Sequence, residues 1–458
     1  MKSGKNGELP LKRDERYPLE WIDDYVKSIR PFVHVRRRDN LLIKIPNEAF
    51  KLNESGVQIL LRLFSGEPIM TLWRSFGGDE VVQRDLYHFF IALKQALQGC
   101  LNEQAPPQGA VIQPFTLGFS ALPILSEVAL TYRCNLRCRF CYAGCGKGSA
   151  SALPEMSTDE VKRVLRCIRE DADVPSVSFT GGEPTLRDDL EHLVTFARRE
   201  LQMHVNLITN GTRIDAQRAV ALAEAGLNSA QVSLEAPCEE VHDRLTGVPG
   251  SFLRALECIR CLQEVGIRVH TNTTLTRANL EHASAMPAFV HSLGLSRFSM
   301  NLMIPAGVDR QDIALLSLRY REIGEHVLRI KKAAEQERVE FMWYSPTPVC
   351  LFNPVAYRLG NKGCAACDGL LSVSPTGGVL PCSSWHEPVG NLLEEPFEEV
   401  WQSARACMIR SKREAPRVCR TCDDFAVCQG ACPLYWHEFG CEELVGLQEG
   451  LCHAVAGT

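Results

Sequence analysis

The sequence has no run of 18 apolar residues, so it does not predict a membrane-spanning helix. Its first residues, MKSGKNGELPLKRDERYPLEW, are charged where a secretory signal would need an apolar core. The chain also lacks a strong excess of charge, because its net charge is −5. We therefore expect a cytoplasmic protein whose partner is neither a membrane nor a nucleic acid.

The chain is rich in cysteine. Its 458 residues include 20 cysteines, with 45% hydrophobic and 23% charged residues, which is typical of a folded protein of two to four domains. Because cytoplasmic thiols stay reduced, this many cysteines indicate metal ligation rather than a disulfide framework. They gather at 134–145 and at 350–452, and the first hundred residues hold only Cys100, so the distribution suggests three regions.

The first region, residues 28–100, has the pattern of a small α+β unit. The segment PFVHVRRRDNLLIKIP predicts a β-hairpin with its turn at Asp39 and Asn40. Asn53 follows a further strand and is placed to cap a helix, and two more helices are predicted near 68–75 and 83–98. We expect the run 36–38, three arginines, to be a solvated face of the hairpin, and a patch for an acidic peptide is the alternative.

This order of elements resembles the PqqD-like family, the RiPP recognition element. The resemblance implies a winged-helix-like unit with a sheet edge to which the leader of a precursor peptide adds a strand. A purely structural domain and a nucleic-acid-binding winged helix remain alternatives. Residues 1–27 would then be an N-terminal tail, and 101–118, rich in Pro, Gly and Gln, would be a linker.

The second region, residues 119–345, alternates short β-rich runs with helical patterns. The six runs are SEVALTY, SVSFT, HVNLIT, SAQVSL, IRVHTNTT and RFSMNLM, and Ser157 and Glu160 have the spacing of a helix capping box. Six strand–helix units predict an α/β fold with a parallel sheet, open or closed into a partial barrel. Such folds keep reactive groups at the carboxyl ends of their strands, and the segment RCNLRCRFCYAGC follows the first strand directly.

The spacing of this segment favours an iron–sulfur cluster. Cys134, Cys138 and Cys141 are separated by three and then two residues. Three thiolates can hold a four-iron cluster and leave one iron open, whereas a closed structural zinc site needs four ligands. Cys145 is either a fourth ligand that closes the site or, as we expect, a spare thiol of the loop.

The motif CX3CX2C after a first strand resembles the radical S-adenosylmethionine (radical SAM) family. The resemblance implies a partial (β/α)6 TIM-like barrel in which Gly181, Gly182 and Glu183 of FTGGEPTL meet the amino group of S-adenosylmethionine. Phe140 would shield the cluster, and Arg244 would bind the carboxylate or have no role. Further contacts are implied at the ends of later strands, at Thr209, Asn210, Ser233, Asn272 and Met303.

The chemistry that this resemblance implies is specific. The open iron would bind the amino and carboxylate groups of S-adenosylmethionine. Reduction by an electron donor such as flavodoxin or ferredoxin would cleave it to methionine and a 5′-deoxyadenosyl radical, which abstracts a hydrogen atom from the substrate. The cofactor supplies this reactivity, and the protein supplies orientation and excludes water.

The third region, residues 346–458, resembles the SPASM extension, which holds two auxiliary [4Fe-4S] clusters. The resemblance gives one cluster Cys382 and Cys432 together with two of Cys350, Cys364 and Cys367, and gives the other Cys419, Cys422, Cys428 and Cys452. A zinc ribbon is the alternative. SPASM enzymes that oxidise sulfatases carry an Asp after the hairpin cysteine, where this chain has Ser383, so we do not expect sulfatase maturation.

Together these patterns predict a radical SAM enzyme that binds the leader of a ribosomally made peptide and modifies that peptide, by a thioether or carbon–carbon cross-link or a related oxidation. Oxidation of a small molecule or a porphyrin side chain is the alternative within enzymes. From another class, the alternative is a zinc-stabilised peptide-binding adaptor without catalysis.

Overall fold

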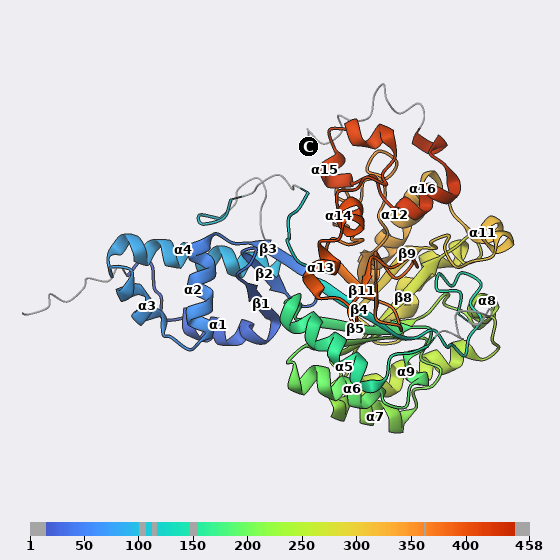
Figure 1. Cartoon of the computed structure of the whole chain (residues 1–458), viewed down its shortest axis with the longest axis horizontal. Coiled ribbons are helices and arrows are strands. Elements are labelled where there is room, and N and C mark those ends of the chain that lie inside the picture. The colour runs from blue at the N-terminus through green and yellow to red at the C-terminus, as the bar shows by residue number, and fades with distance from the viewer. Residues whose placement is uncertain (1–14, 100–106, 112–116, 146–153, 361–362, 445–458) are drawn as a thin grey trace, which may run out of the picture. The chain divides into compact units, whose positions relative to one another are not determined.

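The computed structural model of the chain, shown in Figure 1, describes residues 15–99, 107–111, 117–145, 154–360 and 363–444. The chain divides into two compact units, residues 1–115 and residues 116–458. Most of the predicted linker and Cys452 lie outside the described residues. No helix in the described ranges is both long and apolar enough to cross a membrane.

The first unit is a three-stranded antiparallel sheet packed with helices. The strands are β1 (Val33–Arg36), β2 (Leu41–Lys44) and β3 (Glu48–Lys51), in the order β1-β2-β3, which leaves β1 and β3 as edges. The helices are α1 (Ile22–Ile29), α2 (Glu54–Phe64), α3 (Ile69–Ser75) and α4 (Glu80–Gln98). Asn53 caps α2 as predicted, since its side chain accepts a hydrogen bond from the Gly56 N–H at 2.7 Å. Residues assigned to a tail contribute Leu19, Ile22 and Val26 to this core.

The expectation of a solvated arginine face was wrong for Arg36. Its side chain is fully buried and forms two hydrogen bonds of 2.9 Å to the carboxylate of Asp39, across the hairpin turn. Of the three arginines in this run, only Arg37 and Arg38 are exposed. A buried guanidinium is tolerated here because the turn supplies a bidentate partner for it.

The second unit is built on a ten-stranded sheet with the order β10-β9-β8-β7-β6-β5-β4-β11-β12-β13. The six predicted strands are correct within one or two residues. They are β4 (Leu125–Thr131), β5 (Ser176–Gly181), β6 (His204–Thr209), β7 (Ser229–Ser233), β8 (Arg268–Leu275) and β9 (Arg297–Leu302). Together with their helices, these strands form the expected α/β barrel-like fold. All six run parallel to their neighbours.

The sheet is larger than the sequence predicts. On one side β10 (Glu340–Trp343) adds a further parallel strand to β9. On the other side β11 (Leu370–Val373) pairs in parallel with β4, in the register Ser372↔Glu127, and continues into β12 (Gly378–Leu380) and β13 (Gly390–Asn391). The predicted C-terminal hairpin therefore belongs to the same sheet as the first strand of the barrel.

Helices cover one face of this sheet, as Figure 1 shows for α5 (Thr158–Arg166), α6 (Leu190–Thr195), α7 (Ala216–Ala225) and α9 (Ser251–Glu264). The remaining helices of this unit are α8 (Glu239–Thr246), α10 (Met286–Ser292), α11 (Arg310–Leu316), α12 (Tyr320–Glu337), α13 (Phe397–Trp401), α14 (Ala404–Arg410), α15 (Phe425–Cys428) and α16 (Pro433–Phe439). Ser157 and Glu160 form the predicted capping box at the start of α5.

Alternate strand residues pack beneath the helices, for example Val128 and Leu130 of β4 and Val205 and Leu207 of β6. The residues between them point to the opposite side of the sheet, which we call the inner face. Most inner-face residues are polar, and most of these keep some exposed surface: Glu127, Ser178, Asn206, Gln231, Ser233, His270, Asn272, Ser299, Asn301 and Ser372. Since a buried core excludes unpaired polar groups, this face is suited to line a binding space.

The buried pair in the hairpin of the first unit gives a prediction. Asp39→Ala should destabilise this unit by roughly 3–5 kcal/mol, because it removes the two 2.9 Å hydrogen bonds that the Asp39 carboxylate accepts from the buried Arg36 guanidinium. Hydrogen exchange of the amides in β1 and β2 would measure the loss. Arg37→Ala, at the exposed neighbour, should change stability by about 0.5 kcal/mol or less. Equal protection of the hairpin in both variants would contradict this account.

Candidate active site

The first cysteine loop begins where β4 ends, at the carboxyl edge of the parallel strands. The backbone N–H groups of Arg137 and Arg139 donate to the carbonyl oxygens of Thr246 and Leu245, at 2.9 and 3.0 Å. These bonds attach the middle of the loop to the end of α8. The three predicted ligands, Cys134, Cys138 and Cys141, are each partly exposed.

The three thiols lie within electrostatic reach of one another. Burial, with smaller contributions from Glu183 and Cys141, raises the pKa of Cys134 to about 11. Burial also raises the pKa of Cys138, again with contributions from Cys141 and Cys134. Three gathered thiols that are deep in the fold yet still accessible fit an iron–sulfur cluster, whose positive iron would stabilise their thiolate forms. Their role as ligands stays a prediction.

Cys145 lies directly beside this group. It is buried, with 2% of its surface exposed, and its side chain is hydrogen-bonded to that of Cys141. This bond lowers the pKa of Cys141 and raises that of Cys145, which therefore acts as the donor. The structure thus distinguishes three partly exposed thiols from one buried thiol, and the assignment of Cys145 as a spare thiol stays a prediction.

The turn Gly181-Gly182-Glu183 is joined to the start of the cysteine loop by its backbone. The N–H groups of Gly182 and Glu183 donate to the carbonyl oxygens of Thr131 and Arg133, at 2.7 and 2.9 Å. A Cβ atom on Gly181 would lie 2.1 Å from the Thr131 oxygen, and one on Gly182 would lie 2.2 Å from the Arg133 oxygen. Both positions therefore require glycine, because two backbone segments meet there.

The carboxylate of Glu183 is fully buried and bound by protein donors. It accepts hydrogen bonds from the Thr185 N–H at 3.0 Å, the Thr209 hydroxyl at 2.8 Å and the Asn210 N–H at 2.8 Å. Burial raises the pKa of Glu183, and these bonds oppose the rise. The side chain of Asn210 donates in turn to Asn135 of the cysteine loop, at 3.0 Å. Glu183, Thr209 and Asn210, all predicted to contact the cofactor, thus form one network.

The other predicted contacts lie at different places around the strand ends. Ser233 is partly exposed at the end of β7. Asn272 donates to Asn301 at 2.8 Å and accepts from Ser299 at 2.8 Å on the inner face. Phe140 and Met303 belong to one small apolar cluster with Val241 and Leu245. Arg244 forms an ion pair with Glu240 at 3.5 Å, half exposed on α8.

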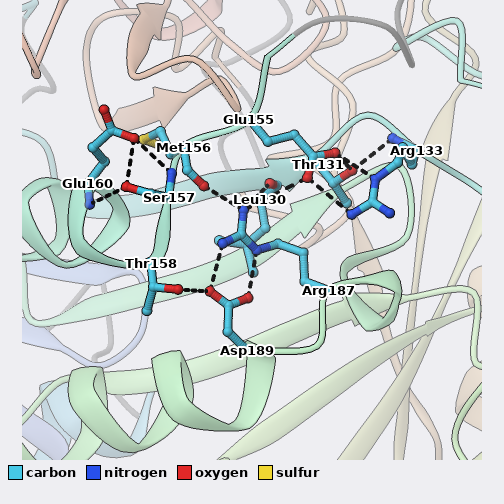
Figure 2. Close-up of polar contacts among 10 residues, drawn as sticks. All are labelled: Leu130, Thr131, Arg133, Glu155, Met156, Ser157, Thr158, Glu160, Arg187 and Asp189. Atoms are coloured by element: carbon cyan, nitrogen blue, oxygen red, sulfur yellow. Dashed lines mark hydrogen bonds and ion pairs between the residues drawn. The ribbon is translucent and has the colours of Figure 1, made fainter.

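A polar network that the sequence did not reveal fixes the two sides of the cysteine loop (Figure 2). Arg133 binds Glu155 at 2.8 Å, and the Thr131 hydroxyl donates to the same carboxylate. The buried Arg187 binds Asp189 through two nitrogens and donates to the Met156 carbonyl oxygen at 2.7 Å. The network ties residues just before and just after the loop to the turn that follows β5.

Glu235 is a second feature that sequence reasoning missed. Its side chain is 3% exposed, and burial raises its pKa to about 8. The Thr274 N–H donates to its carboxylate at 2.8 Å, and its own N–H donates to Nδ1 of His242 at 3.1 Å. Burial lowers the pKa of His242 to about 4, so that imidazole is neutral. No local sequence pattern marks either residue, and only their burial distinguishes them.

The C-terminal cysteines gather in two groups. Cys382 lies within electrostatic reach of Cys364 and Cys432, and Cys367 lies within reach of Cys364. The second group surrounds Cys419, whose neighbours are Cys428, Cys350, Cys422 and Cys441. Of the three cysteines that competed for the first cluster, the structure therefore places Cys364 and Cys367 with the first group and Cys350 with the second.

In the described part of the chain no three side chains of His, Cys, Asp or Glu are close enough together to hold a single metal ion. A four-iron cluster is larger than one ion, so its thiolate ligands stand farther apart.

Comparison with known families identifies the class of protein. Residues 128–285 match the radical SAM superfamily, and residues 364–423 match the SPASM iron–sulfur cluster-binding domain. The chain therefore contains a radical SAM domain and a SPASM domain, and it is an enzyme of this class. Its cofactors are [4Fe-4S] clusters and S-adenosylmethionine.

Within this class, the chain is 29% identical over 353 residues to the AdoMet-dependent heme synthase of Oleidesulfovibrio alaskensis, a match that covers 70% of this chain and 86% of the relative. It is also 29% identical over 307 residues to the PqqA peptide cyclase of Rhodopseudomonas palustris, covering 65% of this chain and 77% of the relative. These relatives act on different substrates, so they do not decide between a porphyrin and a peptide.

A solved structure matches more of the chain. Streptococcus suis SuiB, crystallised with its precursor peptide SuiA, aligns with a TM-score of 0.64 over 89% of this chain and 95% of SuiB, at 17% identity. The second unit makes up only about three quarters of the chain, so the aligned fold extends into the first unit.

The backbone contact at Gly181 gives a prediction. Gly181→Ala should separate the turn from the cysteine loop, because the new Cβ would meet a backbone oxygen that cannot rotate away. We expect a loss of about four irons per chain after reconstitution and a loss of stability of roughly 1–3 kcal/mol. Gly369→Ala is the control, since a Cβ there would meet nothing within 4 Å. Full iron content in Gly181→Ala would show that the contact does not position the cysteines.

Proposed function

We propose that this enzyme modifies a ribosomally synthesised precursor peptide. Hydrogen abstraction from a Cα or Cβ atom would lead to a thioether or carbon–carbon cross-link or to a related oxidation. When bound, the first cluster and S-adenosylmethionine supply the 5′-deoxyadenosyl radical. The chain's own residues hold these groups, position the peptide and keep water out.

The observation that carries this proposal is that neutral polar side chains line the inner face, with Glu127 as the exception within its strands. Its polar side chains bond mainly to one another: Asn206 donates to Ser178 at 3.2 Å, and His270 contacts Gln231 at 3.2 Å. Burial lowers the pKa of His270 to about 4, so this imidazole carries no charge at neutral pH. Hydroxyl, amide and imidazole groups are suited to the donors and acceptors of a peptide backbone.

The same face is poorly suited to a coproporphyrin, whose propionate carboxylates would need cations. Among the described inner-face residues, arginine occurs only at the first positions of strands, as Arg268 and Arg297. Arg268 contacts His204 at 3.1 Å, and Arg297 is paired with Glu340 at 2.7 Å. These arginines lie at the end of the barrel opposite to the cysteine loop, so porphyrin oxidation is the second candidate.

The first unit supports a peptide substrate independently. It has the order of elements expected of a PqqD-like domain, and β3 is an edge strand whose residues are exposed or half-buried. An extended leader could add a strand at this edge. SuiB, a neighbour in fold that has a counterpart of this unit, was crystallised with a precursor peptide.

We assign the metal ligands as follows. Cys134, Cys138 and Cys141 hold the first cluster, which S-adenosylmethionine completes. Cys364, Cys367, Cys382 and Cys432 hold one auxiliary cluster. Cys419, Cys422 and Cys428 hold the other, with the fourth place open to Cys452, Cys350 or Cys441. Flavodoxin or ferredoxin would supply electrons in the cytoplasm, where thiols stay reduced.

Reconstitution without oxygen tests the enzyme. We expect about twelve irons per chain, from three four-iron clusters, and 5′-deoxyadenosine on reduction with S-adenosylmethionine present. Cys138→Ala should abolish 5′-deoxyadenosine formation, and Cys145→Ala should retain it, since Cys145 is not assigned as a ligand. Stoichiometric zinc without 5′-deoxyadenosine would instead identify the peptide-binding adaptor. Equal loss in the two variants would show that the loop is assigned wrongly.

Deletion of residues 1–118 tests the leader. Short peptides encoded beside the gene should bind the full chain and lose most of that affinity when the first unit is removed. Fluorescence anisotropy with labelled peptides would measure the change, and 5′-deoxyadenosine formation without peptide would serve as the control for the remaining unit. Unchanged peptide affinity would remove the leader-binding role, and turnover of iron-coproporphyrin would favour the second candidate.

A further inference from the structure

Glu127 is exceptional on the inner face. Apart from the first residues of the strands, it is the one charged side chain among the inner-face positions that the structure describes in β4 to β11. It lies in the middle of β4, opposite Ser372 of β11. Burial raises its pKa, yet the residue keeps some exposed surface.

Two serines hold this carboxylate. The Ser372 hydroxyl donates to Oε1 of Glu127 at 2.7 Å, and Ser383 adds hydrogen bonds from its side chain and its backbone. Within the described ranges, Glu127 forms no ion pair. Serine donors orient a carboxylate but leave its charge uncompensated, and a buried charge without a partner is costly.

The position of Glu127 relates it to both cysteine sites. Ser383 follows Cys382 of the first auxiliary group, and it also bonds to Tyr142, which follows Cys141 of the first loop. The charge of Glu127 acts on both Tyr142 and Cys382. The carboxylate therefore lies close both to the first cysteine loop and to the first auxiliary group.

We propose that Glu127 binds a cationic side chain of the substrate peptide, the ammonium group of a lysine or the guanidinium group of an arginine. This inference rests on the proposed peptide substrate and names a feature of it. The cation supplies the counter-charge that the inner face lacks, and a charge-assisted hydrogen bond fixes the peptide beside the first cysteine loop. Ser383, the residue after the hairpin cysteine Cys382, orients Glu127. SPASM enzymes that oxidise sulfatases carry an Asp at this position instead.

A single amino acid with both of its ends blocked is sufficient as a probe of this cation-binding site. Nα-acetyl-lysine N-methylamide and its norleucine counterpart share the same carbon stem, and only the first carries an ammonium group. Each would be titrated calorimetrically into the reconstituted full chain with S-adenosylmethionine bound. We expect the lysine probe to bind about tenfold more tightly, the preference typical of a charge-assisted bond, in the wild type and in the control Glu224→Gln, which removes an exposed carboxylate on α7. Glu127→Gln should bind both probes equally.

The unfolding temperature of each variant distinguishes a loss of probe binding from a loss of folding. If Glu127 is held charged for a ligand, Glu127→Gln should unfold at the same or a higher temperature than the wild type, because it removes an uncompensated charge. Equal binding of the two probes by the wild type would overturn the proposal. So would a lysine preference that survives in Glu127→Gln, or a marked drop in the unfolding temperature of that variant, which would identify a structural carboxylate.

The proposed peptide substrate and the proposed role of Glu127 are contradicted by different results. Modification of a peptide without any preference for the lysine probe would contradict only the role of Glu127. A lysine preference in an enzyme that binds no peptide through its first unit and modifies none would contradict only the peptide substrate.

Discussion

The site depends on the contact between two backbone segments, the Gly181-Gly182-Glu183 turn and the residues that lead into the cysteine loop. Two N–H groups of the turn bind carbonyl oxygens of Thr131 and Arg133, at a separation that excludes any Cβ atom. Glu183 then connects the same turn to Thr209 and Asn210 at the next strand end. Because backbone contacts leave little rotational freedom, they fix the position of the start of the loop.

The parallel pairing of β11 with β4 gives the second constraint. It makes the C-terminal hairpin a neighbour of the first strand, although the two are more than 200 residues apart in the chain. The hairpin cysteine Cys382 and the first cysteine loop therefore follow strands of one sheet. Electron transfer and substrate binding between two cluster sites both require a fixed separation, and a shared sheet provides it.

Sequence patterns predicted the elements well and their tertiary partners poorly. The strands β4 to β9 were predictable because alternation and turn residues are local signals. The pairing of β11 was not, because the segment LLSV carries no mark of the strand it joins. We expected Arg36 to be solvated because it stands in a run of three arginines. Only the folded turn shows that the Asp39 carboxylate binds its guanidinium. From the sequence we expected Gly181 to lie against the cofactor, and the structure shows the backbone of Thr131 in contact with it. The spacing of Cys350 could not decide its group, since that depends on how two loops meet in space.

The hydrogen bonds on the inner face also bear on how such an enzyme could acquire a new substrate. Asn206 and Ser178, Asn272 and Asn301, and His270 and Gln231 satisfy one another, so the wall does not need a ligand to complete it. Exchange of one neutral side chain for another would then alter recognition at little cost in folding free energy. A scaffold of this kind can diversify its substrates while its cofactor chemistry stays constant, which is consistent with relatives that include a heme synthase and a peptide cyclase.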